Sequence, residues 1–311
     1  MKHHTIGKIV FVSLCVGLAL LLALLEYFVP LRTLLPAIRI EPRAEGEMRV
    51  HFMGVGEGDC TILEFPDGNV LVVDSGDGSF DTENKLIRYV KGLNATSYSV
   101  VATHADIDHY GGFAELIRTF GADTVYTPFA KSYVGAYKRF TAAVKDSGAQ
   151  VQTLMRYSVI DNPSGAYAVC ISPASAGAQD DNDGSTVLFV SYLGINLLLG
   201  ADISGSREQQ LLDEYALMEG IFDSGEFRVR LEDTDILKVS HHGSAYSSSE
   251  EWLSLLSPEV AVVTCGRGNI YSHPAAESVA RLAGIGADIY RTDELGNIVI
   301  SIKNGNFFIL E

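Results

Sequence analysis

Hydrophobic and polar positions alternate in short stretches through most of the chain from residue 48 onward, as they do in half-buried strands. Between several of these stretches, apolar residues recur every three to four positions instead, which predicts helices with one buried face. In the first half the predicted strands are 48–55, 60–65, 69–76 and 97–103, and the predicted helices are 83–93 and 111–121.

The second half repeats this order of elements. The predicted strands are 185–192, 195–202, 235–244, 258–266, 286–292, 297–303 and 306–310, and the predicted helices are 206–217, 249–256 and 275–284. Hairpin-connected strands, followed by strands that alternate with helices, occur twice, which predicts an α/β fold of two mixed sheets covered by helices. We expect this fold to form one domain over 48–311.

The N-terminal residues have a different pattern. No residue from Ile9 to Leu25 is charged, and two lysines precede this run. The run predicts a transmembrane helix at 1–29, followed by a proline-containing tether at 30–47. A cleaved signal peptide is the alternative. Because the basic residues come first, we expect a single-pass protein of the cell membrane whose main domain lies outside the cytoplasm.

Composition limits the classes of function. Hydrophobic residues make up 47% of the 311 positions, which suits a globular domain with a large core. The net charge of −16 argues against broad binding along a nucleic-acid backbone, which requires excess Lys and Arg. A small anionic substrate stays compatible with this charge, because bound metal ions reverse the sign of a carboxylate-rich pocket.

The sequence THADIDHYGG at 103–112 concentrates metal-binding side chains directly after a predicted strand. His104, Asp106, Asp108 and His109 supply four candidate ligands within six positions, enough to divide between two ions. The alternative is a solvated acidic turn with two incidental histidines. Three later segments also end in such residues, which favours a metal site: they carry Asp202, the pair His241 and His242, and His273.

These motifs together carry a resemblance to a known family. In order they are GVGEGD, VVDSG, THADIDHYGG, LLLGAD, SHHGS and SHP, and they span most of residues 48–311. The set resembles the metallo-β-lactamase-fold hydrolases and, more narrowly, the corresponding domain of the ComEC type of DNA-uptake protein. The resemblance implies a four-layer αββα sandwich and two bound divalent ions.

The family pattern also implies a role for each matching residue. His104 and Asp106 would hold one ion, Asp108 and His109 the other, and Asp202 would bridge them. His242 would complete the second site, with His241 as the alternative. Asp183 stands near the position of a further family histidine, so its role as a ligand is open. Asp59, Asp74 and Ser244 would support the ligands from behind.

Two departures from the family pattern bear on the chemistry. Asp106 replaces the second histidine of the common motif, and a carboxylate there shifts the preference toward Mn²⁺ or Mg²⁺ relative to Zn²⁺. Glu57 occupies a position where the family usually has glutamine.

Such a site suggests a reaction. We hypothesise that the two ions hold a hydroxide that attacks a phosphodiester, and that His273 or His241 protonates the leaving alkoxide. Asp108, His241 and His273 are therefore the residues expected to act in catalysis.

The resemblance implies DNA as the substrate and, because this sequence has one apolar span, a membrane channel as a partner. Residues 129–145 give separate support, since Lys131, Lys138 and Arg139 alternate there with aromatic residues. An amphipathic helix with a basic solvated face explains the same pattern. Other envelope substrates, such as a teichoic-acid-type phosphodiester or a lactone, and a catalytically silent metal-binding module are the alternative functions.

Overall fold

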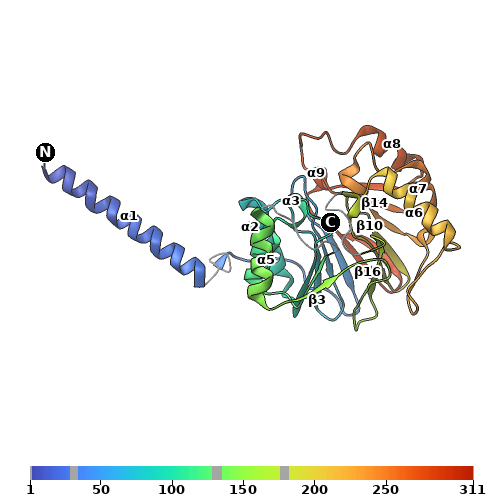
Figure 1. Cartoon of the computed structure of the whole chain (residues 1–311), viewed down its shortest axis with the longest axis horizontal. Coiled ribbons are helices and arrows are strands. Elements are labelled where there is room, and N and C mark those ends of the chain that lie inside the picture. Colours follow the sequence, from blue (N-terminus) through green and yellow to red (C-terminus); the bar gives the residue numbers. More distant parts are fainter. Residues whose placement is uncertain (1, 29–33, 128–134, 176–181, 311) are drawn as a thin grey trace.

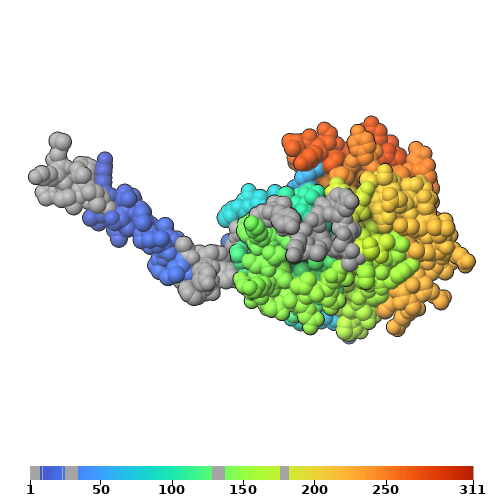
Figure 2. All heavy atoms as spheres, in the orientation of Figure 1, coloured from blue at the N-terminus to red at the C-terminus, as the bar shows by residue number. Residues whose placement is uncertain are grey.

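The computed structural model describes residues 2–28, 34–127, 135–175 and 182–310. Two β-sheets pack face to face, and helices cover the outer face of each sheet (Figure 1). Apart from the projecting blue helix at the N-terminus, the cyan-to-green and yellow-to-red parts of the chain adjoin each other (Figure 2). The expected four-layer αββα arrangement is therefore confirmed.

The first sheet comes mainly from the N-terminal half. Its order is β17-β16-β1-β2-β3-β4-β5-β6, in which β3 to β6 are parallel and the other neighbours are antiparallel. The strands are β1 (Met48–Phe52), β2 (Thr61–Glu64), β3 (Asn69–Val73), β4 (Ser97–Val101), β5 (Thr124–Thr127), β6 (Gln150–Thr153), β16 (Ile298–Lys303) and β17 (Asn306–Leu310).

The second sheet has the order β15-β14-β13-β10-β9-β8-β7, with β10, β13, β14 and β15 parallel. The strands are β7 (Val159–Asp161), β8 (Tyr167–Ser172), β9 (Val187–Tyr192), β10 (Ile195–Leu199), β13 (Ile236–Lys238), β14 (Val260–Val263) and β15 (Asp288–Arg291). A separate two-stranded sheet pairs β11 (Phe222–Asp223) with β12 (Arg228–Val229).

Alternation along the strands explains the layers. In β3, Leu71 and Val73 face the core between the sheets, whereas Val70 and Val72 face the core under the helices. A strand that is buried on both faces must be apolar at nearly every position, and β3 is.

The helices divide between the two outer faces. The first sheet is covered by α2 (Phe80–Leu93), α3 (Ile107–Tyr110), α4 (Phe113–Phe120) and α5 (Gly135–Ser147). The second is covered by α6 (Gly205–Leu217), α7 (Glu250–Leu256) and α8 (Ala276–Gly284), and α9 (Thr292–Leu295) precedes β16. Short 3₁₀ turns lie at Asn182–Gly184, Leu231–Asp233 and Ser240–Gly243.

The N-terminal segment forms α1 (Lys2–Phe28), which extends away from the sheets (Figure 1). Within the described part of the chain, no helix is both long enough and apolar enough to cross a membrane, so the predicted transmembrane helix is not shown.

Residues 34–47 are the described part of the predicted tether at 30–47, and residues 35–40 of it lie against α2. The backbone N–H of Ile38 donates to the Arg88 carbonyl at 3.0 Å, and Ile38 and Ile40 pack against the core under α2. Arg49 donates to the Glu41 carbonyl at 2.7 Å. The described part of this segment is therefore held against the domain by both apolar and polar contacts.

Candidate metal centre

The metal-binding motifs lie at the carboxyl ends of parallel strands. Asp74 follows β3 and the 103–112 motif follows β4 in the first sheet, whereas Asp202 follows β10 and His242 follows β13 in the second. Parallel strands place their carboxyl ends at a common sheet edge, the usual location of binding sites in α/β folds. Each sheet thus delivers polar side chains to one edge.

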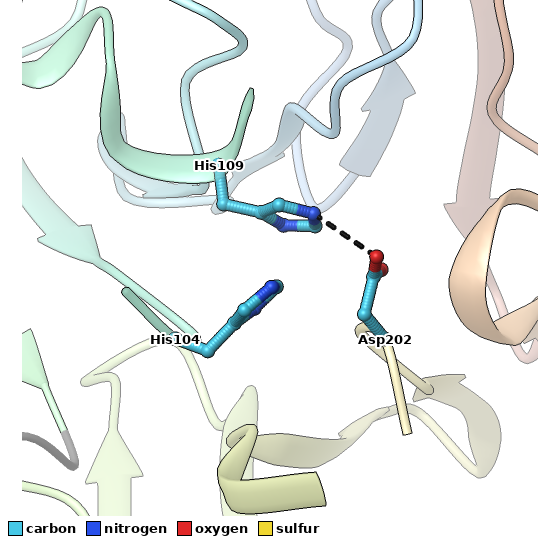
Figure 3. A group of neighbouring side chains, drawn as sticks. All are labelled: His104, His109 and Asp202. Atoms are coloured by element: carbon cyan, nitrogen blue, oxygen red, sulfur yellow. Dashed lines mark ion pairs between the residues drawn. The ribbon is translucent and has the colours of Figure 1, made fainter. Parts of the chain in front are cut away.

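The side chains from the two sheets meet. His109 Nε2 lies 3.3 Å from Asp202 Oδ2, and the rings of His104 and His109 are 4.0 Å apart (Figure 3). Ligand atoms of these three buried residues all lie within 4.8 Å of one another. The structure thus brings the two histidines of the 103–112 motif next to Asp202 from the other sheet.

A second group shares two of its members. His242 Nε2 lies 3.2 Å from Asp202 Oδ2 and 3.8 Å from Asp108 Oδ2, and His109 Nε2 lies 3.9 Å from Asp108 Oδ2. Tetrahedral ligands bound at 2.0–2.2 Å lie about 3.4 Å from each other. We call Asp108, His109, Asp202 and His242 the four-donor group, since four of the spacings between their ligand atoms, 3.2–3.9 Å, are close to that value.

The histidines turn their free nitrogens toward this point. The Nε2 atoms of His104, His109 and His242 and the Oδ1 atom of Asp202 are buried without a hydrogen-bond partner among the described residues. A buried polar atom without a partner costs free energy unless a ligand satisfies it. Neutral imidazole nitrogens and carboxylates are ligands for divalent metals, so these residues fit a bound cation.

Each histidine is held by its other nitrogen. His109 Nδ1 donates to Asp74 Oδ2 at 2.8 Å, His242 Nδ1 to the Thr264 carbonyl at 2.9 Å, and His104 Nδ1 to Thr103 Oγ1 at 3.1 Å. Such bonds fix the tautomer and the ring orientation of metal-binding histidines. Asp74 therefore fixes the ring of a candidate ligand.

The electrostatics of the group favour positive charge. Burial disfavours the charged form of His242, but the carboxylates of Asp202 and Asp59 outweigh it and raise the pKa of His242 to about 10. Burial has the same effect on His109, and Asp202 and Asp74 hold its pKa well above the usual value. The carboxylates thus retain protons on both imidazoles until a cation displaces them.

Asp59 is neutralised by a buried lysine that the sequence analysis missed. Lys238 Nζ donates to Asp59 Oδ2, and Thr264 donates to the other oxygen of the same carboxylate. Lys238 Nζ also lies 3.9 Å from Asp202 Oδ1. Its signal in the sequence was a single lysine inside the buried strand β13, where a charge needs a partner.

Two other predicted ligands lie outside the groups described above. Asp106 Oδ2 lies 3.7 Å from His104 Nε2, with 52% of its side chain exposed. Asp183 Oδ1 accepts a hydrogen bond from the Ser204 N–H at 2.9 Å, at the start of α6. Ser244 Oγ accepts from the Tyr246 N–H at 3.3 Å and shapes the turn after the histidine pair.

The two adjacent histidines occupy different environments. His242 is buried with Nε2 toward Asp202, whereas His241 is 30% exposed with Nε2 3.9 Å from Asp202 Oδ2. Both have positive φ, at 50° and 53°, a conformation uncommon for residues other than glycine. This turn directs only His242 into the four-donor group and leaves His241 at its rim.

His273 lies beside the pair and is held by Glu57. The rings of His241 and His273 are 5.7 Å apart, and His273 Nδ1 lies 2.8 Å from Glu57 Oε1. Glu57 Oε2 accepts from the Gly266 N–H at 3.2 Å, which fixes the carboxylate. A histidine with a fixed ring thus stands next to the candidate metal ligands.

The predicted basic and aromatic surface is only partly present. Lys131 lies outside the described residues, and Lys138 and Arg139 are exposed on α5. Tyr137 and Phe140 of the same helix are buried and pack with Tyr110. The interpretation that these aromatic faces alternate with the cations on the surface is therefore wrong for the described residues.

Comparisons with known proteins agree with this architecture. The family model described as the metallo-beta-lactamase superfamily matches residues 53–267. The chain is 26% identical over 284 residues to ComE operon protein 3 of Bacillus subtilis (strain 168), covering 85% of this chain and 34% of the relative. It is 26% identical over 274 residues to competence protein ComA of Neisseria gonorrhoeae, covering 86% and 34%.

The chain thus spans about a third of the length of these relatives. Among solved structures, it resembles the metallo-β-lactamase fold protein YhfI from Bacillus subtilis with a TM-score of 0.51 and 9% identity, covering 85% of this chain and all of the other. This likeness concerns the fold alone. The chain belongs to the metallo-β-lactamase superfamily, and its main domain is similar to the matching part of ComEC-type competence proteins.

Proposed function

We propose that this chain is a metal-dependent phosphodiesterase that cleaves DNA during uptake. The observation that carries the proposal is the four-donor group, in which four pairs of donor atoms lie 3.2–3.9 Å apart. Its three buried donors include the Nε2 atoms of His109 and His242, which have no hydrogen-bond partner in the part of the chain that the structure describes. Superfamily membership supports metal-dependent hydrolysis, and the name of one relative, a competence protein, favours DNA.

We propose two ion positions. Asp108, His109, Asp202 and His242 would hold one ion, and His104 with Asp202 and Asp106 would hold the other. When bound, divalent ions activate a water molecule and neutralise charge on the phosphodiester during attack. Exposed Asp106 favours oxygen-preferring Mn²⁺ or Mg²⁺ over Zn²⁺ at the second position.

The chain's own residues orient the reaction. Asp74, Thr264 and Thr103 fix the three histidine rings, so the ligands need little rearrangement when substrate binds. Glu57 holds His273 by Nδ1, which leaves Nε2 to donate a proton to the leaving alkoxide. His241 is the second candidate donor, because its ring is partly exposed at the rim of the site.

We further propose that the domain acts outside the cytoplasm. This location rests on the order of the basic and apolar residues at the N-terminus.

Metal reconstitution tests the proposed activity. The chain is stripped of metal, reloaded with Mn²⁺, Zn²⁺ or Mg²⁺, and offered single-stranded DNA, duplex DNA and bis-p-nitrophenyl phosphate. We expect DNA cleavage that requires the metal and is lost in Asp202→Ala. Cleavage of the small diester alone would assign the chain to another envelope phosphodiester. Metal binding without cleavage of any of the three would overturn the proposal in favour of a silent metal-binding module.

A further inference from the structure

The loop between β14 and α8 exposes large apolar side chains next to the metal ligands. Ile270 is 89% exposed and Tyr271 is 63% exposed, two residues before His273. Exposed large apolar side chains that neighbour a binding site indicate contact with a ligand. Both residues are presented on the surface by a loop that belongs to the rim of the site.

This loop is held in one shape by a single side chain. Asn269 Oδ1 accepts from the backbone N–H groups of Tyr271 at 3.1 Å and His273 at 2.9 Å. Asn269 Nδ2 donates to the carbonyls of Gly266 at 2.9 Å and His273 at 2.6 Å. The exposed tyrosine is therefore pre-positioned, which lowers the entropic cost of using it in binding.

A row of stacked rings connects Tyr271 to the metal ligands. The rings of Tyr271 and His273 are 5.7 Å apart with planes at 21°, and those of His273 and His242 are 6.0 Å apart with planes at 27°. His242 is the buried inner end of the row, and Tyr271 is its exposed outer end. Only the His273 ring thus separates the exposed Tyr271 ring from His242, a proposed metal ligand. This position is within reach of a nucleotide next to a phosphate bound at the metal.

Beyond the proposed metal ions, the charge of the chain favours a contact with DNA that is not electrostatic. With a net charge of −16, the protein repels a long polyanion. Nearby cations are already engaged, since Lys238 is buried against Asp59 and Arg267 donates to the Asp293 carbonyl at 3.1 Å. Stacking of bases on aromatic side chains supplies binding energy that does not depend on such cations.

We propose that the exposed face of Tyr271 is a stacking platform for one unpaired nucleobase beside the scissile phosphate. A base inside a duplex is already stacked and paired, so the platform selects single strands or unpaired ends over duplex DNA. Because every base has a flat face, the platform tolerates any sequence. This inference rests on the proposed function and adds the class of substrate.

Binding of a labelled strand tests the platform independently of cleavage. Fluorescence anisotropy would compare the metal-loaded chain with Tyr271→Ala and Tyr271→Phe on an uncleavable single-stranded oligonucleotide, and on an abasic strand of the same length. Stacking worth about 1–3 kcal/mol per base corresponds to a loss of about 5- to 150-fold in affinity. We expect that loss for Tyr271→Ala on the normal strand, near-normal binding for Tyr271→Phe, and no difference between the proteins on the abasic strand.

Leu217→Ala is the matched control, because Leu217 is 85% exposed at the far end of α6 and its loss removes apolar surface away from the site. Equal affinities of Tyr271→Ala and the parent for the normal strand would overturn the platform, and so would an equal loss on the abasic strand. Cleavage assays separate this result from the function itself. Parent DNA cleavage with no Tyr271 effect rejects only the platform, whereas a Tyr271 effect on binding without cleavage rejects only the phosphodiesterase.

Discussion

Asp74→Asn tests whether the groups behind the ligands set the metal affinity. The Asp74 carboxylate is 2% exposed and accepts three hydrogen bonds: from Thr103 N–H at 2.9 Å, Thr103 Oγ1 at 2.8 Å and His109 Nδ1 at 2.8 Å. Asparagine preserves the shape and tolerates the positive φ of 59° at this position. Its amide nitrogen cannot accept, so one of these donors loses its partner.

The expected magnitude follows from the contact with His109. Loss of the carboxylate weakens both the orientation and the basicity of that ligand, and such changes cost 10- to 100-fold in metal affinity, or about 1.4–2.8 kcal/mol. Competition with a chromophoric chelator would measure the affinity for Zn²⁺ and Mn²⁺ directly.

Asp67→Asn is the matched control, since Asp67 lies exposed at the opposite end of β3 and loses the same charge. We expect it to leave the affinity unchanged. If Asp74→Asn bound metal within twofold of the parent, or if both variants lost affinity equally, the reasoning about His109 would be refuted.

Three further outcomes follow from the same contacts. Lys238→Met should lower the free energy of unfolding by about 3–5 kcal/mol, because it removes the lysine counter-charge of buried Asp59. Urea denaturation should show partial recovery when Asp59→Asn is added. Glu57→Ala should lower kcat by roughly 10- to 100-fold with little change in KM, because His273 loses its orientation. Glu57→Gln retains an acceptor for His273 Nδ1 and should retain more activity in the same steady-state assay. The metal-free chain should lose stability as the pH rises from 6.5 toward 10. The pKa of His242 is about 10 in the folded chain and 6.5 in the unfolded chain, so protonation of His242 stabilises the fold fully only below this range. Thermal unfolding measured across the same pH range should show no such loss for the metal-loaded chain.

Local sequence patterns were sufficient to predict most of the layers of the fold and the sheet edge at which the candidate ligands lie. In β3 the period of two already separates Leu71 and Val73 from Val70 and Val72, and the structure places these pairs in different cores. His104, His109 and Asp202 each follow an apolar strand, so their common edge could be predicted before their distances were known.

Contacts between segments that are distant in the sequence could not be predicted. Lys238 meets Asp59 across 179 positions, and no local pattern indicates which carboxylate neutralises a buried lysine. The short strands β5 to β8 were not predicted, because stretches of three to six residues without a clear period carry little signal.

The aromatic residues of α5 decide between two interpretations of the same sequence pattern. Tyr137 and Phe140 are three positions apart, a spacing that places both on one helical face, and that face packs on the core. The cations between them lie on the other face. The helical period was therefore sufficient to favour the amphipathic helix with a basic solvated face over the interpretation in which aromatic residues and cations share one surface.

The most direct measurement is an anomalous difference map from crystals of the chain loaded with Mn²⁺. We expect a strong peak about 2.0–2.2 Å from the ligand atoms of Asp108, His109, Asp202 and His242, with a second peak near His104. Peaks confined to exposed carboxylates elsewhere on the surface, with none at the four-donor group, would contradict the central claim that these residues form a metal centre.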